Sequence, residues 1–214
     1  MISILLIAVP VSVILLIFQK QIRIALVRLK YGRYSYRYVN QFKKYANKSP
    51  FPYCFKDEIF SYLRLTSYKK AETVIYDSEK IILFEDVPTR LTFDAILRQY
   101  GKPDCFNAYQ IQNKELRSWG YYKKLFGVEV QAVFFTLNEN YVMGEYIIEN
   151  STAVDIDKFT AALKTKYGIV DTGQSSPFKI KGTETTSLLF YDNGFSALVR
   201  YYNMTDNGLM ELIG

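Results

Sequence analysis

The first eighteen residues, MISILLIAVPVSVILLIF, contain no charged side chain. A helix rises about 1.5 Å per residue, so a segment of this length nearly crosses a hydrocarbon core of about 30 Å. The apolar character continues past Lys20 to Leu29, and a lysine at the membrane boundary can extend its ammonium group to the headgroups. The sequence therefore predicts a transmembrane anchor over residues 1–30.

A cleaved signal peptide is the main alternative for this apolar segment. Such a peptide carries basic residues before its apolar core and small residues at a cleavage site. Here no lysine or arginine precedes the core, and no A-x-A-like site follows it. A buried core helix fits less well, because the segment is apolar on every side. We therefore expect an uncleaved signal anchor with a single pass through the membrane.

The charge is unevenly distributed along the chain. Residues 1–56 contain ten basic and no acidic side chains, whereas the remainder contains 17 basic and 21 acidic ones. Basic residues that follow a spanning segment favour the cytoplasmic side. The pattern predicts that the N-terminus lies outside and the folded domain in the cytoplasm, as for a bacterial inner-membrane protein.

Residues 31–54 form a juxtamembrane neck in which tyrosines alternate with basic side chains. Tyrosine favours the membrane interface, and basic residues favour anionic lipid. The same pattern suits single-stranded nucleic acid, which we disfavour because the span would hold this segment at the bilayer. Packing against the domain or a sister protomer is a third interpretation. The predicted membrane-interface residues are Lys20, Arg23, Arg28, Lys30, Tyr31, Arg33, Tyr34, Tyr36, Arg37 and Tyr38.

The sequence contains no histidine and two cysteines, Cys54 and Cys105. Without histidine, histidine-dependent triads and H-E-x-x-H zinc sites are impossible, and no phosphate-binding glycine loop is present. Two cysteines could form one bridge, but free thiols in a reducing compartment are the simpler interpretation. We expect no catalytic residues, no metal site and no cofactor.

Residues 55–214 predict a folded α+β region, in which helices pack on an antiparallel sheet behind the transmembrane helix. Thr92 is a good N-cap for a helix that ends before Gly101, and Asp155 is the expected N-cap of a second helix. Asn193-Gly194 is a strong hairpin signal. The expected strands are residues 73–76 paired with 81–84, then 106–111, 118–123, 129–137, 141–149, 187–191 and 195–202.

The two halves of this region follow the same order of signals. In each, a capped helix ends in Tyr-Gly and a long aromatic hairpin follows. This order suggests two tandem α-β-β units, over about residues 90–150 and 151–204. Coincidence remains the alternative, since α-β-β runs are common.

The run from Thr92 to Gly101, the Gly101-Lys102-Pro103-Asp104 turn and the strand Trp119-Gly120-Tyr121 carry a resemblance. Together they resemble the small outer-membrane-assembly (SmpA/OmlA) lipoproteins and the related β-lactamase-inhibitor-protein fold, over about residues 90–204. The resemblance implies helices packed on an antiparallel sheet and a role in binding other proteins. The chain departs from that family, because no lipid-bearing cysteine follows the apolar segment and a spanning anchor is expected instead.

The chain is rich in aromatic residues, with 19 Tyr, 15 Phe and 1 Trp. Tyrosine is enriched at protein interfaces. The sequence predicts a non-enzymatic, membrane-anchored interaction or scaffold subunit, with a protein partner or a second copy as its target and nucleic acid disfavoured. A ligand- or lipid-sensing module and an enzyme that uses carboxylates or tyrosine are the alternatives. The candidate partner-binding residues are Trp119, Tyr121, Tyr122, Tyr201 and Tyr202.

Overall fold

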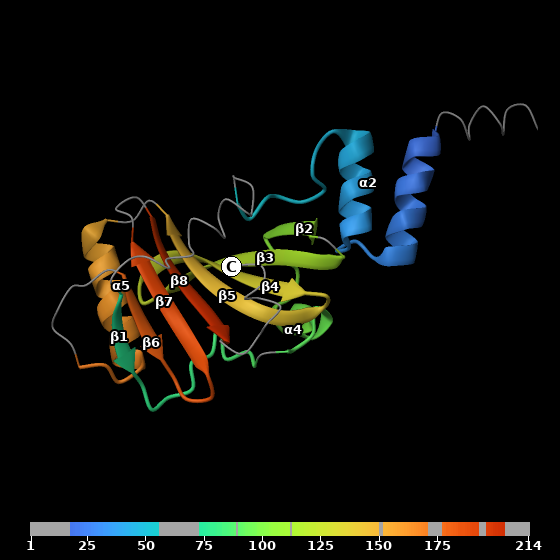
Figure 1. Cartoon of the computed structure of the whole chain (residues 1–214). Coiled ribbons are helices and arrows are strands. Elements are labelled where there is room, and N and C mark those ends of the chain that lie inside the picture. The colour runs from blue at the N-terminus through green and yellow to red at the C-terminus, as the bar shows by residue number, and fades with distance from the viewer. Residues whose placement is uncertain are drawn as a thin grey trace, which may run out of the picture. The chain divides into compact units, whose positions relative to one another are not determined.

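The computed structural model describes residues 18–55, 73–88, 90–111, 113–149, 152–170, 177–192 and 196–203. The chain divides into two compact units, one that ends at Pro52 and one that begins at Tyr53. Figure 1 shows the helices of the first unit in blue and the sheet of the second unit from green to red.

The described part of the first unit, residues 18–52, contains two helices joined by a tight turn. Residues 18–31 are helical, and α2 (Tyr36–Ala46) follows. Gly32, with a φ of 80°, takes a left-handed conformation that glycine adopts without strain. Ser35 is the N-cap of α2, and its hydroxyl accepts a hydrogen bond from the backbone N–H of Tyr38 at 3.2 Å. The turn and cap together begin a second helix directly after the first.

The predicted transmembrane helix is not found among the described residues. None of the helices in that part of the chain is both long and apolar enough to cross a bilayer. The helix over residues 18–31 carries Lys20, Arg23, Arg28 and Lys30, which shorten its uncharged stretches. The predicted spanning fold and single-pass localisation are therefore wrong for this part of the chain. Residues 1–17, which hold most of the predicted anchor, lie outside the described residues.

Eight strands of the second unit form one sheet within the described residues, in the order β1-β6-β7-β8-β5-β4-β3-β2 (Figure 1). Neighbouring strands are antiparallel except for β1 and β6, which are parallel, so the sheet is mixed. The strands are β1 (Val74–Asp77), β2 (Cys105–Ile111), β3 (Lys114–Leu125), β4 (Val128–Leu137), β5 (Asn140–Glu149), β6 (Phe178–Lys181), β7 (Thr186–Asp192) and β8 (Ser196–Asn203).

Two helices, α4 (Phe93–Tyr100) and α5 (Ala153–Lys166), pack on one face of this sheet, here called the helix face. Phe93 of α4 lies edge-on to Trp119 of β3, with ring centroids 4.7 Å apart. Phe159 of α5 contacts Tyr146 of β5 at 6.4 Å. Both helices are therefore held by aromatic side chains that point to the same side of the sheet.

Both α4 and α5 begin at a threonine N-cap. Thr92 caps α4 as predicted, and its hydroxyl accepts from the backbone N–H of Ala95. The prediction that Asp155 caps α5 is wrong. Thr152 is the N-cap, and Asp155 completes a capping box from the N3 position. The helix begins one turn earlier because this reciprocal pair satisfies two backbone N–H groups, whereas Asp155 alone would satisfy one.

The predicted hairpin of residues 73–76 and 81–84 is also wrong. Strand β1 pairs with β6 instead, and Phe84 packs on the helix face against Phe134, with ring centroids 4.9 Å apart, and Tyr146, at 4.7 Å. Gly144 makes room for this ring, because a Cβ there would lie 2.1 Å from Phe84. Residues 81–84 therefore bury the ring of Phe84 instead of forming a strand that pairs with β1.

The predicted fold class needs a further correction. The sheet is mixed, and α4 is followed by four strands (β2–β5) and α5 by three (β6–β8), so the halves are not α-β-β units on an antiparallel sheet. The two series of strands meet where β5 pairs with β8. An origin of residues 90–150 and 151–204 by duplication stays a prediction.

Candidate binding groove

Cys54 and Cys105 form a disulfide, with Cα atoms 5.0 Å apart. The interpretation as free thiols is therefore wrong. The backbone N–H of Cys54 also donates to Asn107 Oδ1 at 3.0 Å, and Phe55 stacks on Phe135 with centroids 5.8 Å apart. These contacts hold residues 54 and 55 against the sheet. Because disulfides persist in oxidising compartments, this bond also argues against the predicted cytoplasmic location.

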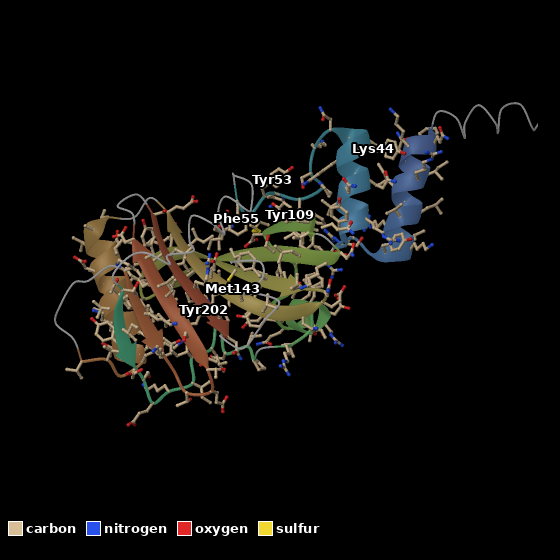
Figure 2. All side chains as sticks on the ribbon, viewed as in Figure 1. Lys44, Tyr53, Phe55, Tyr109, Met143 and Tyr202 are labelled. Atoms are coloured by element: carbon tan, nitrogen blue, oxygen red, sulfur yellow. A yellow bond between two sulfur atoms is a disulfide. The ribbon has the colours of Figure 1, made fainter. Side chains whose placement is uncertain are left out.

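The disulfide lies on the sheet face opposite the helix face, here called the disulfide face. Met143 and Tyr202 lie directly opposite each other on β5 and β8. Figure 2 labels these two side chains together with Phe55 and Tyr109, which belong to the same hydrophobic cluster. The buried members of that cluster are Cys54, Phe55, Cys105, Leu116, Val133, Phe135, Leu137, Val142, Met143, Ile147 and Leu198.

Gly120 of β3 makes space for the disulfide. It lies opposite Cys105 in the β2–β3 register. A Cβ at this position would approach Cys105 Sγ to 3.0 Å and Val133 Cγ2 to 3.1 Å. Contacts of that length are tighter than carbon atoms normally tolerate, so a side chain here would displace the sulfur. The absence of a side chain lets the bridge lie close to the sheet.

Next to the disulfide, a groove of about 420 Å³ crosses strands β3, β4 and β5. Tyr122 lies opposite Gln131, and Gln131 lies opposite Ile147, so these three side chains form a row across the three strands. Because side chains alternate along a strand, Lys124 and Glu129 fall on the same face one step further along. The described residues that line the groove are Tyr122, Lys123, Lys124, Glu129, Val130, Gln131, Ile147 and Glu149.

The groove combines an aromatic wall, a polar floor and a charged rim. Tyr122 is 68% exposed although it lies on a paired strand. Gln131 is buried, and its Nε2 donates to Cys105 Sγ at 3.2 Å and to the Tyr122 hydroxyl at 3.4 Å. At the rim, Lys124 Nζ lies 3.9 Å from a carboxylate oxygen of Glu129. Such a groove can accept both an apolar group and hydrogen-bonding groups.

The structure separates the five predicted partner-binding residues. Tyr122 lines the groove, and Tyr202 lies half-buried on the same disulfide face. Trp119 and Tyr201 are buried on the helix face, where they pack against Phe134 and Phe84. Tyr121 also faces the helices, and its hydroxyl donates to the Gly101 carbonyl at 2.9 Å. The surface open to a partner therefore contains Tyr122 and excludes the buried pair.

Sequence reasoning missed Gln131, the floor of the groove. It lies in a strand that was predicted correctly, but its importance comes from its neighbours on β3 and β5. The alternation of side chains on β4 places Gln131 on the same face as Val133 and Phe135, and a polar residue in such an apolar row was the available signal.

A second polar cluster, on the helix face, surrounds Glu85. Its carboxylate accepts hydrogen bonds from Lys123 Nζ at 2.7 Å and from the Tyr146 hydroxyl at 2.6 Å. Burial, and secondarily the charge of Glu85, raises the pKa of Tyr146, and burial raises the pKa of Tyr167 to about 12. Because the carboxylate is both paired and hydrogen-bonded, this cluster holds the turn at Phe84 in place.

The predicted membrane-interface residues all lie in the first unit, on the helix over residues 18–31, on α2 and in the turn between them. Several of these residues contact one another. The guanidinium of Arg37 lies 4.5 Å from the ring centroid of Tyr31, and that of Arg33 lies 4.8 Å from the ring of Tyr34. Tyr34 also stacks on Phe51 at 5.2 Å. The aromatic and basic residues of the neck thus pack together.

Within the described ranges, no group of three or more histidine, cysteine, aspartate or glutamate side chains is placed to hold a metal ion. No protein-family model matches the sequence, and searches of curated proteins and of solved structures found no match. The resemblance to the SmpA/OmlA lipoproteins stays a prediction. Over its described residues, the second unit is a mixed eight-stranded sheet with two helices on one face and a disulfide on the other.

Proposed function

We propose that the second unit is a non-enzymatic binding domain, and that its groove over β3–β5 holds an extended segment of a partner protein. The observation that carries this proposal is the exposure of Tyr122 beside the buried Gln131. An exposed ring on a paired strand is a ready contact surface, since tyrosine supplies a large area with few torsions to immobilise.

The chemistry of the groove favours a peptide. A glutamine carboxamide offers an acceptor and donors, which match the N–H and C=O of a peptide group. Gln131 Nε2 is engaged by Cys105 and Tyr122, which orients the carboxamide. Ile147 supplies an apolar contact in the same row. The rim carries both charges, from Lys124 and from Glu129, so a segment with polar ends is accommodated.

The groove is less suited to acid–base chemistry. A catalytic carboxylate is normally shifted in pKa by burial or by a close like charge. The side chain of Glu129 is 86% exposed, so water screens it. The other carboxylate that lines the groove, Glu149 on β5, is exposed as well, and the partner of Glu129 in the β3–β4 register is Lys124.

Site-specific photocrosslinking in the full chain tests this proposal. A photoreactive benzoylphenylalanine replaces Tyr122 in cells that express the protein, and the control variant carries it at Ile75. Ile75 is 52% exposed and lies on β1, at the far edge of the sheet. We expect one discrete protein adduct from position 122 and none from position 75.

A Lys124→Glu substitution in the chain that carries the crosslinker should reduce the yield of that adduct, because it reverses the charge at the rim. Absence of any adduct from position 122, or the same adducts from both positions, would refute the proposal. A small molecule that co-purifies with the protein and is lost in Gln131→Leu would instead make the groove a ligand pocket.

A further inference from the structure

The helix over residues 18–31 exposes an apolar stripe. Leu29 is 83% exposed and Leu26 is 59% exposed, and Phe18 and Ile22 are exposed beside them. At 3.6 residues per turn, these four side chains fall within about 80° of one another around the helix. A continuous exposed stripe on a surface helix indicates a binding face, because scattered apolar residues would show no such periodicity.

The opposite side of the same helix is the one that contacts α2. Ile24 and Val27, which lie about half a turn away from the stripe, are partly buried. Arg23 Nη1 donates to the Tyr45 hydroxyl on α2 at 3.3 Å. The helix therefore has two apolar sides, one that packs within the first unit and one that is exposed.

The unit that carries the stripe is strongly basic. Residues 18–52 contain nine lysines and arginines and no aspartate or glutamate. Arg23 and Lys30 lie to one side of the stripe, and Arg28 lies to the other. A partner that complements this surface must be anionic and must also cover aliphatic side chains.

We infer that this helix lies on the surface of an anionic lipid bilayer, with its apolar stripe among the headgroups and its basic flanks against the phosphates. Amphipathic helices with leucine and phenylalanine on one face and lysine and arginine beside it bind membranes in this way. The arrangement is independent of the groove, and it requires no helix that crosses the bilayer.

Nucleic acid fits the same surface less well. Proteins bind single strands with exposed aromatic rings on which bases stack. Here the stripe is mainly aliphatic, and the nearby rings of Tyr31 and Tyr34 each have a guanidinium over one face, from Arg37 and Arg33. An aliphatic stripe has no counterpart on a phosphate backbone, whereas it has one in the acyl region of a bilayer.

A fluorescent probe on the stripe tests the inference. Because Cys54 and Cys105 are joined, a single new cysteine in Leu29→Cys of the full chain can be labelled with an environment-sensitive dye. The matched control is Asn40→Cys, an exposed position on α2 of the same unit. Vesicles of phosphatidylcholine alone are compared with vesicles that contain equal parts of phosphatidylglycerol.

We expect a blue shift of the Leu29 probe with the anionic vesicles, reversed by salt, and no shift of the Asn40 probe. Arg28→Gln and Lys30→Gln should each weaken vesicle binding about fivefold, the effect of one basic residue at an anionic surface. No shift with anionic vesicles, or an equal shift with neutral ones, would overturn the inference. A shift produced by a single-stranded oligonucleotide, or by protein concentration alone, would replace the bilayer with nucleic acid or a second copy.

Discussion

Removal of the Cys54–Cys105 disulfide should destabilise the second unit by about 4 kcal/mol. The two cysteines are 51 residues apart in the sequence. A cross-link over a loop of that length lowers the entropy of the unfolded chain by an amount equivalent to about 4 kcal/mol at 25 °C. The native contacts of Cys54 and Phe55 with Asn107 and Phe135 remain after reduction, so the loss comes mainly from the unfolded state.

Urea unfolding of the oxidised and reduced protein measures this effect. Trp119, the single tryptophan, is fully buried and reports unfolding by its fluorescence. With a denaturant dependence of about 2 kcal/mol/M, the midpoint should fall by about 2 M in urea on reduction. The double variant Cys54→Ala/Cys105→Ala should unfold near the reduced midpoint and should not respond to reductant.

A count of reactive thiols checks the disulfide directly. A thiol reagent applied to the unreduced, denatured chain should find no reactive cysteine. Two reactive thiols per chain, or equal urea midpoints with and without reductant, would refute the predicted stabilisation by the disulfide. That result would favour free thiols in a reducing compartment.

Gly144→Ala should lower the free energy of unfolding by about 3 kcal/mol because its Cβ would overlap Phe84. Phe84→Ala should cost less in the Gly144→Ala chain than in the native sequence, so the two losses should be less than additive in urea titrations. Stability should fall as the pH rises above about 10, by about 1.4 kcal/mol per pH unit for each tyrosine that ionises only when unfolded. The loss that comes from Tyr167 should stop near pH 12, because its pKa in the folded protein is about 12. A urea midpoint that does not change between pH 10 and pH 12 would contradict the burial of these rings. Glu145→Ala should lower the free energy of unfolding by about 3–5 kcal/mol, because it removes the carboxylate that pairs with the buried Arg200 guanidinium, whereas Glu145→Met combined with Arg200→Leu should be close to neutral in a double-mutant cycle. The pH prediction concerns the buried tyrosines with a raised pKa, which are Tyr141, Tyr146, Tyr167 and Tyr201.

The strands that hairpins connect were predictable from the sequence. The ranges 129–137 and 141–149 match β4 (Val128–Leu137) and β5 (Asn140–Glu149) to within a residue. Alternating and β-branched residues on both sides of the Asn138-Glu139 turn carry the information locally, since neighbouring strands of a hairpin pair through a short turn. The same holds for the helix that begins after Thr92.

Pairings between distant segments were not predictable in this way. The residues of β1 pair with those of β6 about a hundred positions later, and no local signal prefers that partner over the adjacent run 81–84. The decision depends on where Phe84 is buried, and that depends on the absence of a side chain at Gly144. The correct choice therefore required the packed helix face, which a one-dimensional pattern does not contain.

The candidate groove shows the same division between local and distant information. Tyr122 was predicted from its residue type, whereas its neighbours depend on register across three strands. Trp119 and Tyr201 have equally suitable side chains for binding but lie on the opposite face, because each is an odd number of residues from a groove-side position of its strand. A one-residue shift in register would exchange the two sets.

Gln131 connects the disulfide to the groove. Its Nε2 donates to Cys105 Sγ and to the Tyr122 hydroxyl, so one side chain contacts both the disulfide and the aromatic wall of the groove. The hydrogen bond from Gln131 holds the rotamer of this side chain only while its acceptor, Cys105 Sγ, stays in place. The disulfide bond to Cys54 and the space left by Gly120 fix the position of this sulfur. The disulfide on β2 therefore helps to orient the carboxamide of Gln131 on β4, the strand that also carries Glu129 at the rim of the groove. We expect the hydrogen bond from Gln131 to restrict the exposed Tyr122 side chain, which would reduce the side-chain entropy lost if a partner binds at the proposed groove.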